Sequence, residues 1–293
     1  MRVAAIEPPP SRALASALAT RVVTGIVLVA AVLAALFALP PLAFGVVLLL
    51  IVVMAALEWA TLIGLAGASR AAFAIVTLVA GAALLWLGAD RGAAPVVVAV
   101  CGVATLFWIA VGVPSVLRNW QPASSWVRAA SALVGLEGAL VAILACRAHS
   151  PWLALAAMAI VWIADTAAYF SGRRFGRHKL APAISPGKTR EGAYGALIGV
   201  AVYALALVPL AERAGYRGAH DTYAIVVWTL FALALAALSI VGDLHESLLK
   251  RRAGAKDSGA ILPGHGGVLD RIDALVAAMP PAALAATAFL RPA

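Results

Sequence analysis

Charged side chains are scarce in this sequence. Asp, Glu, Lys and Arg make up 12% of its 293 residues, whereas they make up about 25% of an ordinary soluble domain. Hydrophobic residues reach 64%, and the mean hydropathy is +1.00. This composition excludes an ordinary soluble protein and indicates a protein that lies in the lipid bilayer.

Cysteine is also rare, and a basic tail and sequence repeats are both missing. The two cysteines, Cys101 and Cys146, lie far apart within apolar stretches, so we interpret them as small hydrophobic residues rather than a metal or redox motif. The net charge is +9, but it is not gathered in a tail, so we expect no nucleic-acid partner. No small-residue cleavage site follows the first apolar run, and we expect no signal peptide to be removed.

The apolar residues form continuous runs, which predict membrane-spanning helices. Only a helix or a closed barrel satisfies its own backbone hydrogen bonds in lipid, and a spanning helix needs about 20 apolar residues. The runs are 22–39, 42–57, 71–88, 93–113, 129–146, 151–170, 191–211, 222–242 and 268–290. We therefore predict an all-α, polytopic integral membrane protein with about nine transmembrane helices. Residues 1–150 would form an N-terminal part of about five spans, and residues 151–293 a C-terminal part that carries the motifs.

Lys and Arg are distributed unevenly across the predicted membrane. Of the 22 Lys and Arg residues, 16 fall on the side of the N-terminus, five on the other side, and Arg271 lies in the last span. Cytoplasmic loops carry the excess of such residues, so we expect a cytoplasmic N-terminus in the inner (plasma) membrane. All four lysines lie in two cytoplasmic loops, 171–190 and 243–267, where ammonium groups can bind phosphate oxygens.

One carboxylate lies inside an apolar run. Asp165 is near the cytoplasmic end of the span 151–170, and a carboxylate costs about 2.5–3.5 kcal/mol at the bilayer centre on insertion scales. Asp165 either pairs with Arg173 or Arg174 at the interface, or lines a polar cavity with Tyr169, one helical turn later. The second interpretation predicts an active-site cavity on the cytoplasmic side.

A polar loop follows this span, with the sequence Ser185-Pro-Gly-Lys-Thr-Arg-Glu-Gly. It resembles a nucleotide-binding phosphate loop only in Gly-Lys-Thr, because such a loop needs a glycine where this chain has Pro182 and must follow a strand. Exposed amides, Lys188 and the hydroxyls of Ser185 and Thr189 still form a candidate anion site. They lie at the entrance of a helix that starts near Glu191.

The segment from Asp243 to Asp273 carries the strongest signal. If the eighth helix continues past Gly242, then Asp243, Glu246, Ser247 and Lys250 share one face. The polar residues of the glycine-rich loop and of the next helix start are Lys256, Asp257, His265, Gly266, Gly267, Asp270, Arg271 and Asp273. Carboxylates suit Mg²⁺, and a second cation is a further expectation, while the basic groups can neutralise phosphate oxygens. Together they predict an in-line displacement at phosphorus.

This segment resembles the signature of the phosphatidate cytidylyltransferase (CDP-diacylglycerol synthase) family. The matching residues are Ser247, Lys250, Arg251, Lys256, Asp257, Pro263, His265, Gly266, Gly267, Asp270, Arg271 and Asp273. Asp165, the loop from Ser185 to Gly192 and the Gly-Asp-Leu sequence at 242–244 are similar as well, so the resemblance covers roughly residues 160–273.

The resemblance implies that CTP and phosphatidic acid react, with Mg²⁺, to give CDP-diacylglycerol and pyrophosphate, in a helical homodimer. It implies that Asp243 and Asp270 are metal ligands with Asp273 beside them, and that Lys250 and Arg271 take part in catalysis. The residues that it places at the substrates are Asp165, Ser185, Lys188, Thr189, Ser247, Lys256, Asp257, His265, Gly266 and Gly267.

Two alternatives remain. An ion-coupled transporter also places acids beside broken helices, but it should show matching repeats, and the first half of this chain has little buried charge beyond Glu58 and Glu137. A CTP-dependent lipid kinase, or a cytidylyltransferase that acts on another lipid, could use the same metal chemistry.

Overall fold

The computed structural model describes residues 11–213, 221–262, 264 and 266–289, with side chains from residue 22 onward. The helices are α1 (Ser11–Ala38), α2 (Pro41–Leu62), α3 (Gly67–Trp86), η1 (Ala89–Arg91), α4 (Ala94–Phe107), η2 (Trp108–Gly112), α5 (Val113–Leu117), α6 (Ser125–His149), α7 (Pro151–Phe175), α8 (Arg190–Arg213), α9 (Thr222–Arg252) and α10 (Leu269–Phe289). The strands are β1 (Lys179–Ala181) and β2 (Ser185–Thr189). The predicted helical membrane protein is confirmed.

Within the described part of the chain, eight helices are long and apolar enough to cross a membrane. They correspond to the predicted spans from 42–57 onward, and the apolar part of α1, Val22–Ala38, is shorter. The count of nine therefore stays a prediction. The short run 42–57 belongs to a 22-residue helix, because α2 begins at Pro41, which suits the first helical turn, and continues to Leu62.

Helix α6 forms the centre of the N-terminal half. It packs against α2, α4 and α10, and 72% of its most apolar stretch is buried inside the protein. Small residues allow this close packing: a Cβ atom added at Gly138 would clash with Ala104 of α4. Cys101 and Cys146 are buried in this region as free thiols, in line with their interpretation as small hydrophobic residues.

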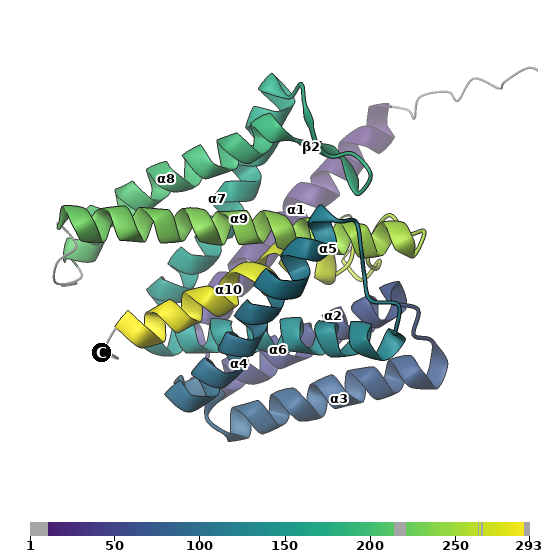
Figure 1. Cartoon of the computed structure of the whole chain (residues 1–293), viewed down its shortest axis with the longest axis horizontal. Coiled ribbons are helices and arrows are strands. Elements are labelled where there is room, and N and C mark those ends of the chain that lie inside the picture. Colours follow the sequence, from purple (N-terminus) through teal and green to yellow (C-terminus); the bar gives the residue numbers. More distant parts are fainter. Residues whose placement is uncertain (1–10, 214–220, 263, 265, 290–293) are drawn as a thin grey trace, which may run out of the picture.

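A second, smaller apolar cluster joins α7, α8 and α9. In Figure 1, α9 runs across the middle of the molecule, with α8 and the strands on one side and α2, α3 and α6 on the other. Helix α9 contacts elements on both sides, but α10 makes the main contact between the two halves, because it packs against α4 and α6 as well as α9. The predicted division at residue 150 stays a prediction.

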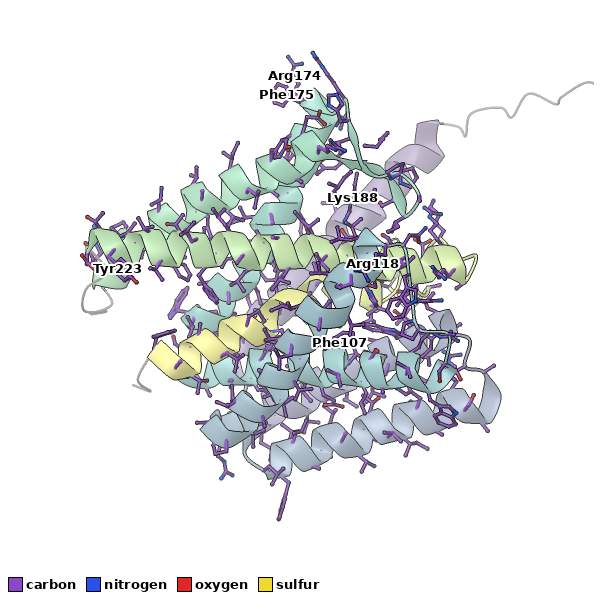
Figure 2. The ribbon with its side chains drawn as sticks, viewed as in Figure 1. Phe107, Arg118, Arg174, Phe175, Lys188 and Tyr223 are labelled. Atoms are coloured by element: carbon purple, nitrogen blue, oxygen red, sulfur yellow. The ribbon has the colours of Figure 1, made fainter. Side chains whose placement is uncertain are left out.

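The loop predicted between α7 and α8 contains an antiparallel hairpin, residues 179–189, in which Lys179 pairs with Thr189 and Ala181 with Ser185. These two short strands are an addition to the all-α prediction. Figure 2 shows Lys188 on this hairpin and Arg118 on the same side of the molecule, whereas Tyr223 lies at the far end of α9. The charged loops therefore gather at one end of the helices.

Candidate active site

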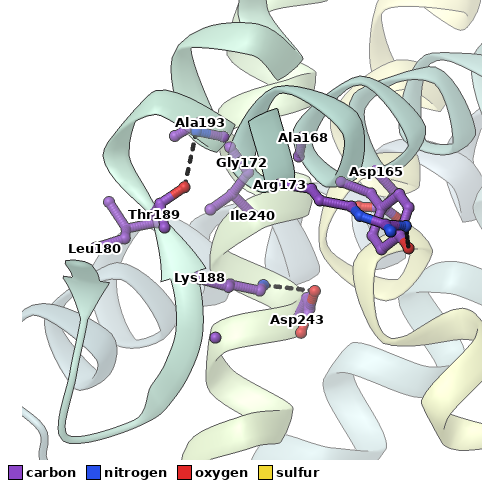
Figure 3. A pocket seen from close by; sticks show the side chains of 13 residues that line it. Asp165, Ala168, Gly172, Arg173, Leu180, Lys188, Thr189, Ala193, Ile240 and Asp243 are labelled. Atoms are coloured by element: carbon purple, nitrogen blue, oxygen red, sulfur yellow. Dashed lines mark hydrogen bonds and ion pairs between the residues drawn. The ribbon is translucent and has the colours of Figure 1, made fainter. Parts of the chain in front are cut away.

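A pocket of about 380 Å³ lies between α7, the hairpin, α8 and α9. Its polar residues are Asp165, Tyr169, Arg173, Lys188, Thr189 and Asp243. Lys188 extends from β2 toward α9, where its Nζ lies 2.5 Å from Oδ2 of Asp243 (Figure 3). We call Asp165, Lys188 and Asp243 the pocket cluster. Charged residues from three separate elements, α7, β2 and α9, thus line the pocket.

The hairpin is fastened at its base by Glu191, in the first turn of α8. The Glu191 carboxylate accepts hydrogen bonds from the backbone N–H groups of Arg177 and His178, and it lies 2.6 Å from Nδ1 of His178. Thr189 caps α8, since its Oγ1 accepts a hydrogen bond of 3.1 Å from the Gly192 amide. At the start of α8, which was predicted as an anion site, Thr189 therefore occupies one backbone amide, and Glu191 adds a negative charge.

The tip of the hairpin is fastened to α9. Ile184 is 3% exposed and packs in an apolar cluster with Leu244 and Leu248 of α9. Nε of Arg251 donates a hydrogen bond of 3.2 Å to the Ile184 carbonyl. With both ends fixed, the strand between them holds Lys188 over Asp243. Ser185 is half-buried in the hairpin and is not among the residues that line the pocket.

A second charged cluster lies further along α9, which continues past Gly242 as predicted. Nζ of Lys250 lies 2.5 Å from Oε2 of Glu246 and 2.7 Å from Oδ1 of Asp270. We call Glu246, Lys250 and Asp270 the loop cluster. The other oxygen of Asp270, Oδ2, accepts hydrogen bonds from the amides of Ser258 and Gly267, at 3.0 and 2.8 Å. Asp270 therefore joins α9 to the loop that precedes α10.

Helices α9 and α10 approach closely at Gly242. A Cβ atom added there would lie 2.5 Å from the Asp273 carbonyl oxygen and 2.9 Å from Cβ of Ala277. This proximity brings the Asp273 carboxyl group near those of Asp243 and Glu246. Asp273 therefore lies near Asp243 of the pocket cluster and Glu246 of the loop cluster.

The other residues predicted at the site either are not among those that line the pocket or lie beyond the described positions. Ser247 is half-buried on α9, whereas Lys256, Asp257 and Arg271 are exposed. Gly266 has φ +82°, and a Cβ atom there would lie 2.8 Å from Oδ2 of Asp270, so this turn requires glycine. His265 and Pro263 lie outside the described residues.

The chemistry of the donors fits a hard cation. Five carboxylates, Asp165, Asp243, Glu246, Asp270 and Asp273, gather around two lysines, Lys188 and Lys250. Oε1 of Glu246 is buried and has no hydrogen-bond partner. Such an excess of carboxylate oxygen suits Mg²⁺. Across the described positions, however, no three acidic, His or Cys side chains already form a ligand set.

Sequence reasoning noted Glu58 only as a buried charge and gave no role to Glu58 or Ser258. Glu58 belongs to α2 and is 3% exposed, and its carboxylate accepts hydrogen bonds from the Ser258 hydroxyl and from the amides of Val268 and Leu269. A carboxylate in an apolar helix is a signal in itself. Its partner could not be predicted from the sequence, because Glu58 and Ser258 are 200 residues apart along the chain.

These observations define a polytopic membrane protein with a carboxylate- and lysine-rich pocket at one end of its helices. The chain belongs to the cytidylyltransferase family, which matches residues 19–289. A protein of Haemophilus influenzae named phosphatidate cytidylyltransferase is 36% identical over 279 residues, which cover 89% of this chain and 95% of that protein. A protein of Pseudomonas aeruginosa with the same name is 38% identical over 268 residues, covering 89% and 93%.

Proposed function

We propose that this chain transfers the CMP moiety of CTP to phosphatidic acid, which gives CDP-diacylglycerol and pyrophosphate. The observation that carries this proposal is the match over nearly the whole chain to relatives named phosphatidate cytidylyltransferase. The pocket supports it, because the Lys188 ammonium group and the carboxylates of Asp165 and Asp243 converge there, in a protein whose long apolar helices suit a lipid substrate.

The reaction is a displacement at the α-phosphorus of CTP. An anionic oxygen of the phosphatidic acid headgroup attacks this phosphorus, and the bond to the oxygen that bridges the α- and β-phosphates breaks, so pyrophosphate leaves. Because the attacking oxygen is already anionic, no general base is needed. Lys188, now paired with Asp243, would turn toward the phosphate oxygens as negative charge develops on the leaving group. Lys250 would contribute its positive charge from its place beside Glu246 and Asp270.

Mg²⁺ would be held by Asp243 and Asp273, with Asp270 as the further predicted ligand, and a second cation would share these carboxylates. When bound, the metal ion would neutralise phosphate charge and orient the triphosphate. The buried oxygen of Glu246 without a partner lies beside this set and supports the placement of a cation there. Asp270 differs from the other two, since both of its oxygens already accept hydrogen bonds within the protein.

Purified protein in detergent tests the proposal. Given CTP, phosphatidic acid and Mg²⁺, it should form CDP-diacylglycerol and pyrophosphate in equal amounts, and an excess of EDTA should stop the reaction. Product no higher than in an Asp243→Asn control would refute it. A CTP-dependent lipid kinase would instead release CDP from a mixture with diacylglycerol, and other lipid phosphates in place of phosphatidic acid test the remaining alternative.

We also propose that the charged loops lie on the cytoplasmic side of the inner membrane, where CTP is found. We further propose that the protein is a homodimer. The excess of Lys and Arg on these loops supports the orientation. Both native cysteines are buried, so a cysteine that replaces exposed Lys256 can be labelled selectively in vesicles of known orientation. Labelling from the periplasmic side alone would contradict this orientation. A monomeric mass in detergent would contradict the dimer.

A further inference from the structure

Glu58 is a buried carboxylate that lies in the N-terminal half of the chain but has its partners in the C-terminal half. It is near the end of α2, and it accepts hydrogen bonds from the Val268 amide at 3.0 Å and the Leu269 amide at 2.8 Å. These amides lie at the start of α10, where N–H groups have no partner within the helix and negative charge is favourable. Glu58 thus caps α10 from another helix.

The chain around Glu58 is shaped to fit it. A Cβ atom added at Gly259 would lie 2.8 Å from Cδ of Glu58, and one added at Gly267 would collide with the Glu58 carboxylate and with Oγ of Ser258. Two glycines of the loop therefore close directly on this carboxylate. An apolar side chain in its place would leave the amides at the helix start unpaired in a buried site.

Ser258 connects Glu58 to the loop cluster. Its hydroxyl donates a hydrogen bond of 2.8 Å to Glu58 and accepts one of 3.3 Å from the Asp270 amide. The Ser258 amide donates to Oδ2 of Asp270, whose Oδ1 pairs with Lys250. An uninterrupted set of hydrogen bonds therefore runs from α2 through the loop to a predicted metal ligand and a predicted phosphate-binding lysine.

The residue after Glu58 fixes α2 to the same helix that carries Lys250. The ring of Trp59 lies 6.1 Å from that of His245, whose Nδ1 is 2.9 Å from Oγ of Ser115. His245 comes directly before Glu246 on α9. Helix α2 is thus tied to both sides of the loop cluster, through Glu58 to the loop and through Trp59 to α9.

We propose that Glu58 is a positioning residue for catalysis: through its hydrogen bonds to Ser258, Val268 and Leu269 it sets the place of Asp270 and Lys250, so the N-terminal helices complete the active site. This inference rests on the proposed function. It assigns to α2 a part in the reaction, although Glu58 itself touches neither the pocket cluster nor Lys250.

The test compares Glu58→Gln with Glu137→Gln. Glu137 is the matched control, because it is also buried in an apolar helix but both of its oxygens have no hydrogen-bond partner. Glutamine at 58 would present an NH₂ group to donors, so kcat should fall about 10- to 100-fold, the effect of losing a hydrogen bond to a charged group. The Mg²⁺ concentration for half-maximal rate should rise, while Glu137→Gln leaves both values unchanged.

Three further results separate positioning from general loss of structure. Glu58→Asp should recover part of the activity, and adding Ser258→Ala to Glu58→Gln should cost less than the two single effects combined, because both act through one network. Trypsin should cut after exposed Lys256 faster in Glu58→Gln than in the wild type or Glu137→Gln. This cleavage needs no activity, so it reports on the loop even if no CDP-diacylglycerol forms.

Several outcomes would overturn the inference. Wild-type kcat and Mg²⁺ dependence in Glu58→Gln would do so, as would an equal loss in Glu137→Gln, or unchanged cleavage at Lys256. If Glu58→Gln does not fold, Ser258→Ala alone must show the raised Mg²⁺ requirement and faster cleavage, and failure to do so would equally contradict it. An inactive wild type with faster cleavage in Glu58→Gln would refute the proposed function while retaining the loop's dependence on Glu58.

Discussion

The pocket cluster and the loop cluster each combine one lysine with two carboxylates, and both include residues of α9, yet they are built differently. In the pocket cluster, Lys188 and Asp243 form one ion pair whose side chains are 26% and 30% exposed. In the loop cluster, Lys250 pairs with two carboxylates, and the Asp270 side chain is 7% exposed and accepts two further hydrogen bonds from amides.

This difference assigns the two clusters different tasks. A half-buried ion pair that solvent reaches contributes less to stability than a buried one, so Lys188 and Asp243 can separate at smaller cost when a substrate enters. A buried and fully bonded pair is costly to break, because removing one partner leaves an uncompensated charge. We infer that the pocket cluster exchanges partners during the reaction and that the loop cluster keeps the site in shape.

Replacing one carboxylate in each cluster is the strongest test of whether the two clusters have different tasks. Asp270→Asn places an NH₂ group against either Lys250 or the two loop amides. We therefore expect a loss of about 3 kcal/mol in the free energy of unfolding. Asp243→Asn should change it by less than about 1 kcal/mol. Both should lower kcat/KM by about a thousandfold or more, since both are predicted metal ligands.

The two effects are separated by measuring thermal unfolding and activity on the same detergent preparations. Bound Mg²⁺ would stabilise the wild type and blur the comparison, so unfolding is followed in EDTA. Equal falls in stability for the two variants would show that the clusters do not divide the work in this way.

A substitution at Gly242 tests whether activity requires the close approach of α9 to α10 at Asp273. A methyl group in Gly242→Ala would press on the Asp273 carbonyl oxygen, which is backbone and cannot turn aside. We expect about 1–3 kcal/mol of destabilisation from overpacking and roughly tenfold lower activity, of the order of 1.4 kcal/mol at the transition state. Gly102→Ala is the control: a Cβ atom there meets nothing within 4 Å, so stability should hold or rise.

The fold was largely predictable because lipid imposes long apolar helices. The runs from 42–57 onward mark α2 to α10, and the polar face of Asp243, Glu246, Ser247 and Lys250 is present because α9 continues to Arg252. Periodicity is a local property, so it can be read without knowing which helices touch. The cavity beside Asp165 and Tyr169 also agrees with the expectation from a carboxylate in an apolar run.

Contacts between distant segments could not be predicted in this way. The hairpin shows no alternating pattern in sequence; it is held by Glu191, by burial of Ile184 and by Arg251, all outside its strands. The pairing of Lys188 with Asp243 likewise depends on how the hairpin folds onto α9. The role of Glu58 required knowledge of partners some 200 residues away.

Arg251 provides the smallest and most specific test of the comparison, because it links the hairpin of the pocket cluster to the helix that carries Lys250. Arg251→Ala removes the hydrogen bond to the Ile184 carbonyl, and a loss of about 1 kcal/mol corresponds to about a fivefold change. The burial of Ile184 remains, so the hairpin should keep its fold but hold Lys188 less firmly. We therefore expect KM for CTP to rise about fivefold with kcat nearly unchanged. Arg252→Ala is the control, since Arg252 bonds to the Asn119 carbonyl instead; a similar rise in KM there would show that only the charge of this segment matters.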